Sequence, residues 1–467
     1  MVFATSQTRV ARGSGRPGAG EEDVLTHSEI LRFYLPLVIT SQMMTLSVPL
    51  INLGLGRTAD PALALAGYAV GFSVSVVCNA PVLTARTVTA GLARSPASYG
   101  VVASVMRWLG LSLSSVALVL ALLPPGEWLF LGILGTPSHI AHQARLVLLL
   151  QAPIPILLAE RGLAQGLVLI YRRTLLISLA TLMRLAMVTV VVMTLAVIMQ
   201  LPGSAAGGLS LTAGVGMEAL VIRLAVRRRF GPFREPLPGA SSDDSTMGPG
   251  RVIRFGLPLA INHTVWSLQR ALINAIIARL SDPVTALAGF GVVAPIFLFF
   301  GSPLFAIQST VQVLPRSRRD LLRLAQFTLV MAASLSLSAG VLLWVAGRSI
   351  LSAGYGLAGG PLAAALPALR WIWLHPLIMG FRSYGQGLLL RAGRTGPIAV
   401  GALGRVLVVA AVGLFLVERY PHGNGALMGI GLQILGDGWD MTLAGVWGIA
   451  AVRRTFPGDE VASRGGP

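Results

Sequence analysis

The chain has 467 residues, of which 54% are apolar and only 12% charged, and its mean hydropathy is +0.75. Soluble domains of ordinary composition carry roughly 25% charged residues. A soluble enzyme is therefore excluded, because the chain has too few polar side chains to cover its surface. The formal net charge of +18 comes from arginine, since the sequence contains no lysine. In a membrane protein such charge first reports topology, so it does not indicate a nucleic-acid partner.

The N-terminal segment, residues 1–28, is polar and rich in glycine and arginine. It has no short apolar core before a cleavage site, so we expect a disordered tail and not a signal peptide. The single cysteine, Cys78, allows no internal disulfide.

Twelve apolar segments follow this tail, and each is long enough to cross a hydrocarbon core, which takes ~20 residues. They predict helices over residues 30–56, 62–90, 99–123, 142–170, 174–199, 207–226, 252–278, 284–313, 321–347, 364–390, 395–417 and 424–452. Pro36 and Pro258 each remove a hydrogen bond inside a helix and predict bends. Further breaks are expected at Pro49, Pro81, Pro153, Pro155, Pro295, Pro303 and Pro376.

Arginines gather in alternate loops between these helices. They are Arg94, Arg172 and Arg173, Arg227 to Arg229, Arg316 to Arg323, Arg391 and Arg394, and Arg453 and Arg454. Because cytoplasmic loops hold the basic residues, both termini are expected to be cytoplasmic, which requires an even number of spans. We therefore expect a multi-pass protein of the inner (cytoplasmic) membrane.

The sequence repeats itself. Shifted by 222 positions, residues 30–71 align with 252–293 without a gap and share 18 identities in 42 positions, among them Pro36 with Pro258 and Asn52 with Asn274. A second block recurs at a shift of 221, in which Arg161 and Arg184 fall on Arg382 and Arg405. Six helices per repeat place both copies in the same orientation, an arrangement found in secondary transporters.

This pattern predicts an all-α integral membrane fold, with two parallel six-helix repeats around a central cavity. The expected division is a tail over 1–28, a first half over 29–226, a cytoplasmic linker over 227–250, a second half over 251–455 and a tail over 456–467.

Five arginines are expected at membrane depth: Arg161, Arg184, Arg270, Arg382 and Arg405. Arg161 and Arg382 lie ~14 to 16 Å from the cytoplasmic ends of their helices, at 1.5 Å per residue. The acids at comparable depth are Glu160, Glu218 and Asp440. A guanidinium cannot lose its proton to escape burial, so the surplus of arginine predicts a cavity that attracts anions.

Structural interpretations of the same residues stay open. Glu218 or Asp440 could pair with Arg184 or Arg405 and fix helix packing, and Glu160 points to another helix face than Arg161. Asp437 is a candidate carboxylate for coupling to a proton or cation, or a packing residue. His263 and His375 lie in spans, where they could contact a polar substrate or carry protons. No catalytic set, phosphate-binding loop, metal site or cofactor motif is found.

The two Phe-x-Leu-Pro-Leu openings, at Phe33 and Phe255, resemble the multidrug/oligosaccharidyl-lipid/polysaccharide (MOP) exporter superfamily. Within it, the closer likeness is to the progressive ankylosis protein family. That likeness is carried by Ser267 to Asn274, by His375 through Arg382 to Gly387, and by Gly425 to Gly431 with the acidic segment Gly436 to Asp440. The resemblance implies export of small polyanions such as pyrophosphate, citrate or nucleoside triphosphate through a cavity between the halves.

Three functions follow in order of preference. The first is a secondary exporter of a small anionic metabolite, with the five arginines as substrate-facing residues and a proton or sodium ion as coupling ion. The second is a flippase for a lipid-linked pyrophosphate, and the third is a cation-coupled drug extruder, which would need negative charge in its cavity. We expect a monomer in the bilayer.

Overall fold

The computed structural model describes residues 25–55, 57–134, 137–230, 247–354 and 359–455. The predicted tail over 456–467 and residues 1–24 of the predicted N-terminal tail lie outside the described residues, as does most of the predicted linker. All the regular elements of the described residues are helical.

The first half is built from the helices up to Phe230, and several spans consist of two or three consecutive helical segments. They are α1 (His27–Leu55), α2 (Pro61–Asn79) with η1 (Ala80–Thr84) and α3 (Ala85–Leu92), α4 (Pro96–Leu122), α5 (Pro124–Glu127) with η2 (Trp128–Ile133), α6 (Ser138–Gln151) with α7 (Ile154–Ile170), α8 (Leu175–Met193) with η3 (Thr194–Ile198), and α9 (Gly203–Phe230).

The second half follows the same order. Its elements are α10 (Pro249–Ile277), α11 (Pro283–Gly301) with η5 (Ser302–Leu304) and α12 (Phe305–Val313), α13 (Arg318–Val345), α14 (Gly347–Ser349) with η6 (Ile350–Gly354), α15 (Gly359–Arg370) with α16 (Leu374–Arg391), α17 (Gly396–Arg419), and α18 (Gly425–Thr455). Each of the twelve predicted helices is present, with boundaries shifted by a few residues.

Nine helical spans of the described residues are long and apolar enough to cross a membrane, and α15 with α16, bent by 49°, makes a tenth. The long helices α10 and α18 complete the twelve. They carry more polar residues inside the span, among them Gln269 and Arg270 in α10 and Asp437 and Asp440 in α18. The predicted all-α fold with two six-helix repeats is confirmed.

Local structure repeats along with the sequence. Asp60 and Asp282 each cap the following helix by accepting a hydrogen bond from the backbone N–H three residues later. Ser95 and Ser317 each begin a capping box at the start of α4 and α13. The helix breaks also match, since η1 begins at Ala80 and η5 at Ser302, 222 positions later.

Proline explains some of these breaks and not others. Pro81, Pro153 and Pro303 lie at interruptions, where the missing N–H removes a helix hydrogen bond. Pro49 and Pro295 lie inside the uninterrupted helices α1 and α11, so the breaks expected at those two positions are absent.

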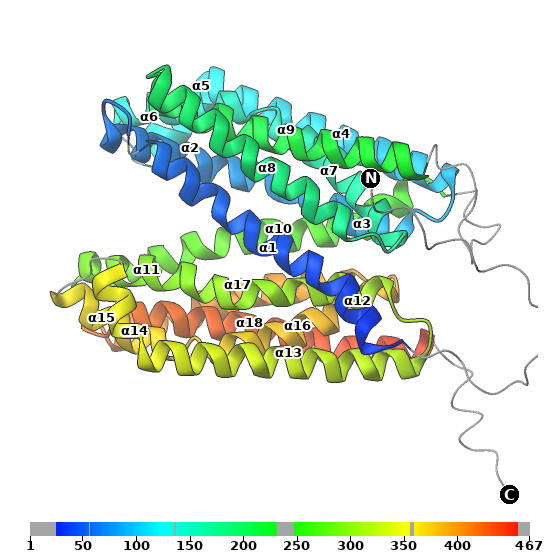
Figure 1. Ribbon diagram of the computed structural model, residues 1–467. Coiled ribbons are helices and arrows are strands. Elements are labelled where there is room, and N and C mark those ends of the chain that lie inside the picture. The colour runs from blue at the N-terminus through cyan, green and yellow to red at the C-terminus, as the bar shows by residue number, and fades with distance from the viewer. Residues whose placement is uncertain (1–24, 56, 135–136, 231–246, 355–358, 456–467) are drawn as a thin grey trace, which may run out of the picture.

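The two halves form separate bundles, with α1 and α10 running between them (Figure 1). We call the end where α1 begins and α18 ends the terminal end, and the opposite end the distal end. Two apolar cores at the terminal end contain residues of both halves, for example Phe33 with Leu314 and Met106 with Phe255. The three other cores of the described residues each belong to one half, and all three include residues at the distal end. The halves are therefore packed together at the terminal end and apart at the distal end.

Candidate functional site

Three helices of the first half bring two arginines to one carboxylate. Glu218 of α9 has no exposed surface, and its Oε2 lies 3.0 Å from Nη1 of Arg161 on α7. Nη1 of Arg184 on α8 lies 3.4 Å from the same oxygen. The other carboxylate oxygen accepts hydrogen bonds from Gln165 (3.1 Å) and Thr181 (3.0 Å). We call these five residues the first-half cluster, and it carries one net positive charge.

The second-half cluster has two arginines and two carboxylates. Asp440 of α18 lies 2.9 Å from Nη1 of Arg405 on α17 and 3.2 Å from Nη2 of Arg382 on α16. Asp437, one turn earlier, lies 3.4 Å from Arg382 and 3.7 Å from Arg405. All four side chains are buried. Their charges cancel, in contrast to the first-half cluster.

His375 of α16 completes this second-half cluster. Its Nδ1 lies 2.9 Å from the backbone oxygen of Phe297, whose ring stacks on the imidazole with centroids 3.5 Å apart. Its Nε2 lies 3.5 Å from Oδ2 of Asp437. The repeat equivalents of His375 and Asp437 in the first half are the apolar Ile154 and Val215. The histidine and the extra carboxylate are therefore additions specific to the second half.

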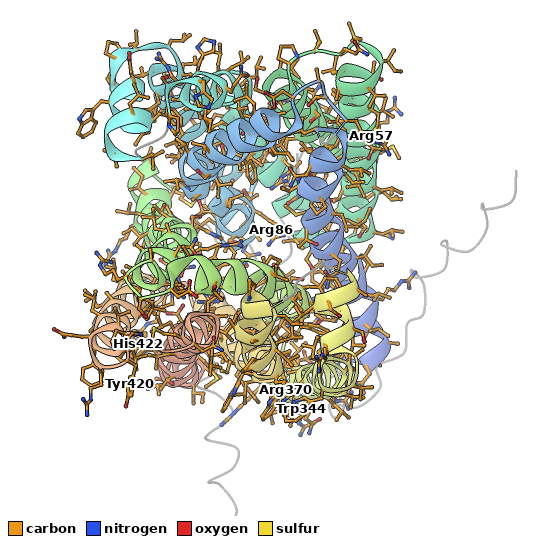
Figure 2. The ribbon with its side chains drawn as sticks, turned by 90° about the vertical axis from the view of Figure 1, so that its left-hand side faces the viewer. Arg57, Arg86, Trp344, Arg370, Tyr420 and His422 are labelled. Carbon is orange, nitrogen blue, oxygen red and sulfur yellow. The ribbon has the colours of Figure 1, made fainter. Side chains whose placement is uncertain are left out.

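Arg86, at the start of α3, lies where the first half faces the second (Figure 2). Two glycines of α7 let α3 approach closely, because a Cβ at Gly162 would lie 3.0 Å from the backbone nitrogen of Arg86 and one at Gly166 would lie 3.0 Å from its oxygen. Arg86 is near enough to Arg161 and Glu218 to interact with their charges. Among the described residues, no carboxylate is within ion-pair distance of its guanidinium.

His263 of α10 links this arginine to the other half. It interacts with the charges of both Arg86 and Arg382. The polar residues thus form a layer across the molecule, from the first-half cluster through Arg86 and His263 to the second-half cluster. It contains five arginines and three carboxylates: Arg86, Arg161, Arg184, Arg382, Arg405, Glu218, Asp437 and Asp440.

Two of the site residues expected from sequence lie elsewhere. Glu160 binds Arg107, and also Arg223 at 3.2 Å, on the half-exposed outer side of α7. Arg270 is exposed on α10, and no described carboxylate is within ion-pair distance of it. The polar layer instead contains Arg86, which was not among the expected site residues, and Asp437, which was a candidate coupling carboxylate.

Arg86 lies near the end of the span predicted over residues 62–90 and is not among the five arginines expected at membrane depth. Its repeat equivalent is the neutral Gln308, so the repeat gave no signal. A signal was present in its position five residues after Pro81, because the break there allows α3 to turn inward onto α7.

No group of three or more His, Cys, Asp or Glu side chains in the described part of the chain could hold a metal ion. No protein-family model matches the sequence. No curated protein matches it either.

Solved structures show what the fold is similar to. The eukaryotic MATE transporter AtDTX14 matches with a TM-score of 0.72 at 15% identity, covering 91% of this chain and 97% of that one. An outward-facing multidrug resistance MATE family transporter of the MOP superfamily matches with a TM-score of 0.71 at 15% identity, over 91% and 96% of the two chains. A MOP superfamily transporter from Pyrococcus furiosus, described as having a binding pocket of reverse polarity that suggests a different function, matches with a TM-score of 0.66 at 15% identity, over 91% and 96%. The chain therefore has the twelve-helix fold of the MATE transporters of the MOP superfamily.

Proposed function

We propose that the chain is a secondary transporter that moves a small organic or phosphate anion by alternating access, and that Arg86 contacts the substrate. The observation that carries this proposal is the guanidinium of Arg86 in the polar layer between the halves, which has no carboxylate at ion-pair distance among the described residues. The four other arginines of the layer already bind carboxylates. A guanidinium without a carboxylate partner is costly at membrane depth, so an anion at this position is favoured.

The arrangement of the cores supports alternating access. Apolar cores shared by both halves lie at the terminal end only, and the distal cores are separate. Two rigid bundles joined at one end can exchange access by rocking about the layer between them. With both termini in the cytoplasm, as the arginine-rich loops predict, this arrangement is outward-facing.

His375 and Asp437 support a proton as the coupling ion. The carbonyl oxygen of Phe297 only accepts hydrogen bonds, so Nδ1 of His375 must donate to it. In a neutral imidazole, Nε2 then carries a lone pair that faces the Asp437 carboxylate at 3.5 Å. One proton, on either Nε2 or Oδ2, turns this repulsion into a hydrogen bond. The pair is therefore built to hold one proton, and Arg382 and Arg405 on the same carboxylates connect it to the polar layer.

The test is uptake of labelled pyrophosphate, citrate and ATP into proteoliposomes under a pH gradient. The native protein should transport at least one of these anions, and Arg86→Gln should reduce its rate by about tenfold or more, since a hydrogen bond to a charged group contributes about 1.5–3 kcal/mol. Arg107→Gln is the matched control, because Arg107 lies on the outer side of the protein with Glu160, and its rate should be unchanged.

Transport of a cationic dye without transport of any of the anions would overturn the proposal and favour the drug extruder. Equal rates in native protein and Arg86→Gln would remove Arg86 from the substrate site.

A further inference from the structure

A second basic site lies at the terminal end, away from the polar layer. A cavity of about 440 Å³ is enclosed by the start of α1, the turn between α7 and α8, and the end of α12. Three arginines line it, Arg32, Arg172 and Arg173, together with one acid, Glu29. The cavity therefore carries a surplus of positive charge.

The single acid does not neutralise these arginines. Oε2 of Glu29 accepts hydrogen bonds of 2.9 Å from both the backbone N–H and the hydroxyl of Thr26, and so caps the first turn of α1. Within the described ranges, no carboxylate is at ion-pair distance from Arg32 or Arg173. Among the described residues, the positive charge of Arg32 and Arg173 is therefore not cancelled by an ion pair.

Arg172 has a backbone conformation that argues for a functional role. Its φ is +56°, in the left-handed region, where a side chain other than glycine costs roughly 1 kcal/mol or more. The repeat equivalent is Gly393, with φ of +69°. Both residues end their helices with the same pair of backbone hydrogen bonds, from Arg173 to Val168 and Arg172 to Leu169, and from Arg394 to Leu389 and Gly393 to Leu390. The first half thus has an arginine where the second half has the unstrained residue.

The side chain of Arg172 reaches across to the second half. Its Nη2 donates a 3.0 Å hydrogen bond to the backbone oxygen of Leu314, at the end of α12. Burial, and after it the charge of Arg316, lowers the pKa of the Arg172 guanidinium below its ordinary value. An anion next to this guanidinium would offset the cost of burying its positive charge, and so stabilise the side chain that makes the bond between the halves.

The cavity lies beside the ends of two candidate membrane spans, where lipid headgroups are expected. One of these spans begins at His27 and the other at Leu175. Leu175 and Leu179, which line the cavity, are 61% and 48% exposed, as expected for side chains that face acyl chains. Basic pockets between transmembrane helices bind phospholipid headgroups through such a combination of arginine and apolar surface.

We propose that the phosphate of an anionic phospholipid binds among Arg32, Arg172 and Arg173 and holds the two halves together at the terminal end through Arg172. The site is distinct from the polar layer and does not depend on which substrate is transported. The second half has Gly393 at the position equivalent to Arg172, so the proposed link through this side chain has no counterpart there.

The experiment is native mass spectrometry of the full chain with phosphatidylglycerol and phosphatidylcholine of the same acyl length. The native protein should bind phosphatidylglycerol about tenfold more tightly. The double variant Arg32→Gln with Arg173→Gln should abolish this preference, because both positive charges are removed. The double variant Arg32→Lys with Arg173→Lys should keep it, because both positive charges are retained. Arg172 is left in place, so the bond to Leu314 is not removed by the substitutions. Only folded, monodisperse protein is compared.

The matched control is the double variant Arg279→Gln with Arg348→Gln, which changes two exposed arginines at the distal end. This variant should bind both lipids as the native protein does. Equal binding of the two lipids by native protein would overturn the proposal, as would an undiminished preference in the Gln variant. Displacement of phosphatidylglycerol by millimolar inorganic phosphate would also overturn it, because the site would then take a free anion. The distribution of distances between spin labels on the two halves at the terminal end should become narrower when phosphatidylglycerol is added. A distribution that does not change with the lipid would contradict its role in holding the halves together.

Discussion

Asp440 of α18 occupies the same place in the second half that Glu218 of α9 occupies in the first, 222 positions earlier, and each carboxylate binds the two equivalent arginines of its own half. The repeat therefore preserves a buried ion-pair centre and not only a helix order. Where the two centres differ, in His375, Asp437 and Arg86, the difference is expected to carry the function.

Removing the shared carboxylate of the first half should be strongly destabilising. In Glu218→Gln, Arg161 and Arg184 lose their only charged partner in the cluster, which costs about 3–5 kcal/mol in the free energy of unfolding. Asp440→Asn should cost less, because Asp437 still binds both Arg382 and Arg405. Chemical denaturation in mixed micelles measures both values. Glu160→Gln, at the partly exposed pair with Arg107, should cost at most about 1 kcal/mol, and a similar loss in all three variants would contradict this account.

Replacing Arg172 by glycine should relax the backbone while loosening the terminal end. The left-handed φ costs glycine nothing, and the lost hydrogen bond to Leu314 contributes about 1 kcal/mol, so the free energy of unfolding should change little. Spin labels at the exposed positions Ala97 and Arg319, in a Cys78→Ser background, should show a broader distance distribution. Gly393→Ala is the converse control: its φ of +69° should make it less stable by about 1 kcal/mol, with distances as in native protein.

Replacing His375 tests the proposed proton site. Its Nδ1 donates to the carbonyl oxygen of Phe297, and its Nε2 lies 3.5 Å from Oδ2 of Asp437. The amide of His375→Gln can donate a hydrogen bond but cannot carry a proton. The variant should therefore abolish transport driven by a pH gradient in proteoliposomes, whereas a native rate would exclude the pair as the coupling site.

Two glycine substitutions should change the stability of the protein in opposite directions. A Cβ at Gly385 of α16 would lie 2.6 Å from the carbonyl carbon of Ala444 on α18, so Gly385→Ala must push the two helices apart, at a cost of about 1–3 kcal/mol. A Cβ at Gly431 in α18 meets nothing within 4 Å, so Gly431→Ala should stabilise the helix by about 0.5–1 kcal/mol. Thermal unfolding in detergent distinguishes the two, and destabilisation by Gly431→Ala would show that this helix face is covered in the membrane.

Much of the fold could be predicted from sequence, because membrane-spanning helices are recognised by their length and hydropathy. The repeat also identified Arg161 with Arg382 and Arg184 with Arg405 as equivalent buried residues. The lateral arrangement could not be predicted, because helix depth says nothing about which face a side chain occupies. Arg270 and Glu160 have suitable depths and lie outside the polar layer, whereas Arg86 enters it only because the chain breaks after Pro81 and α3 packs against Gly162.

The shared cores at the terminal end bear on the rate of the proposed transport. Opening that end would expose to water Phe33 and Phe255, which are now 3% and 6% exposed, along with Leu314. Each such side chain costs about 1.5–3 kcal/mol to bring into water, so parting the halves is expected to be the slowest step of a turnover. Smaller side chains at these positions should then raise the turnover rate even as they lower the stability of the resting protein.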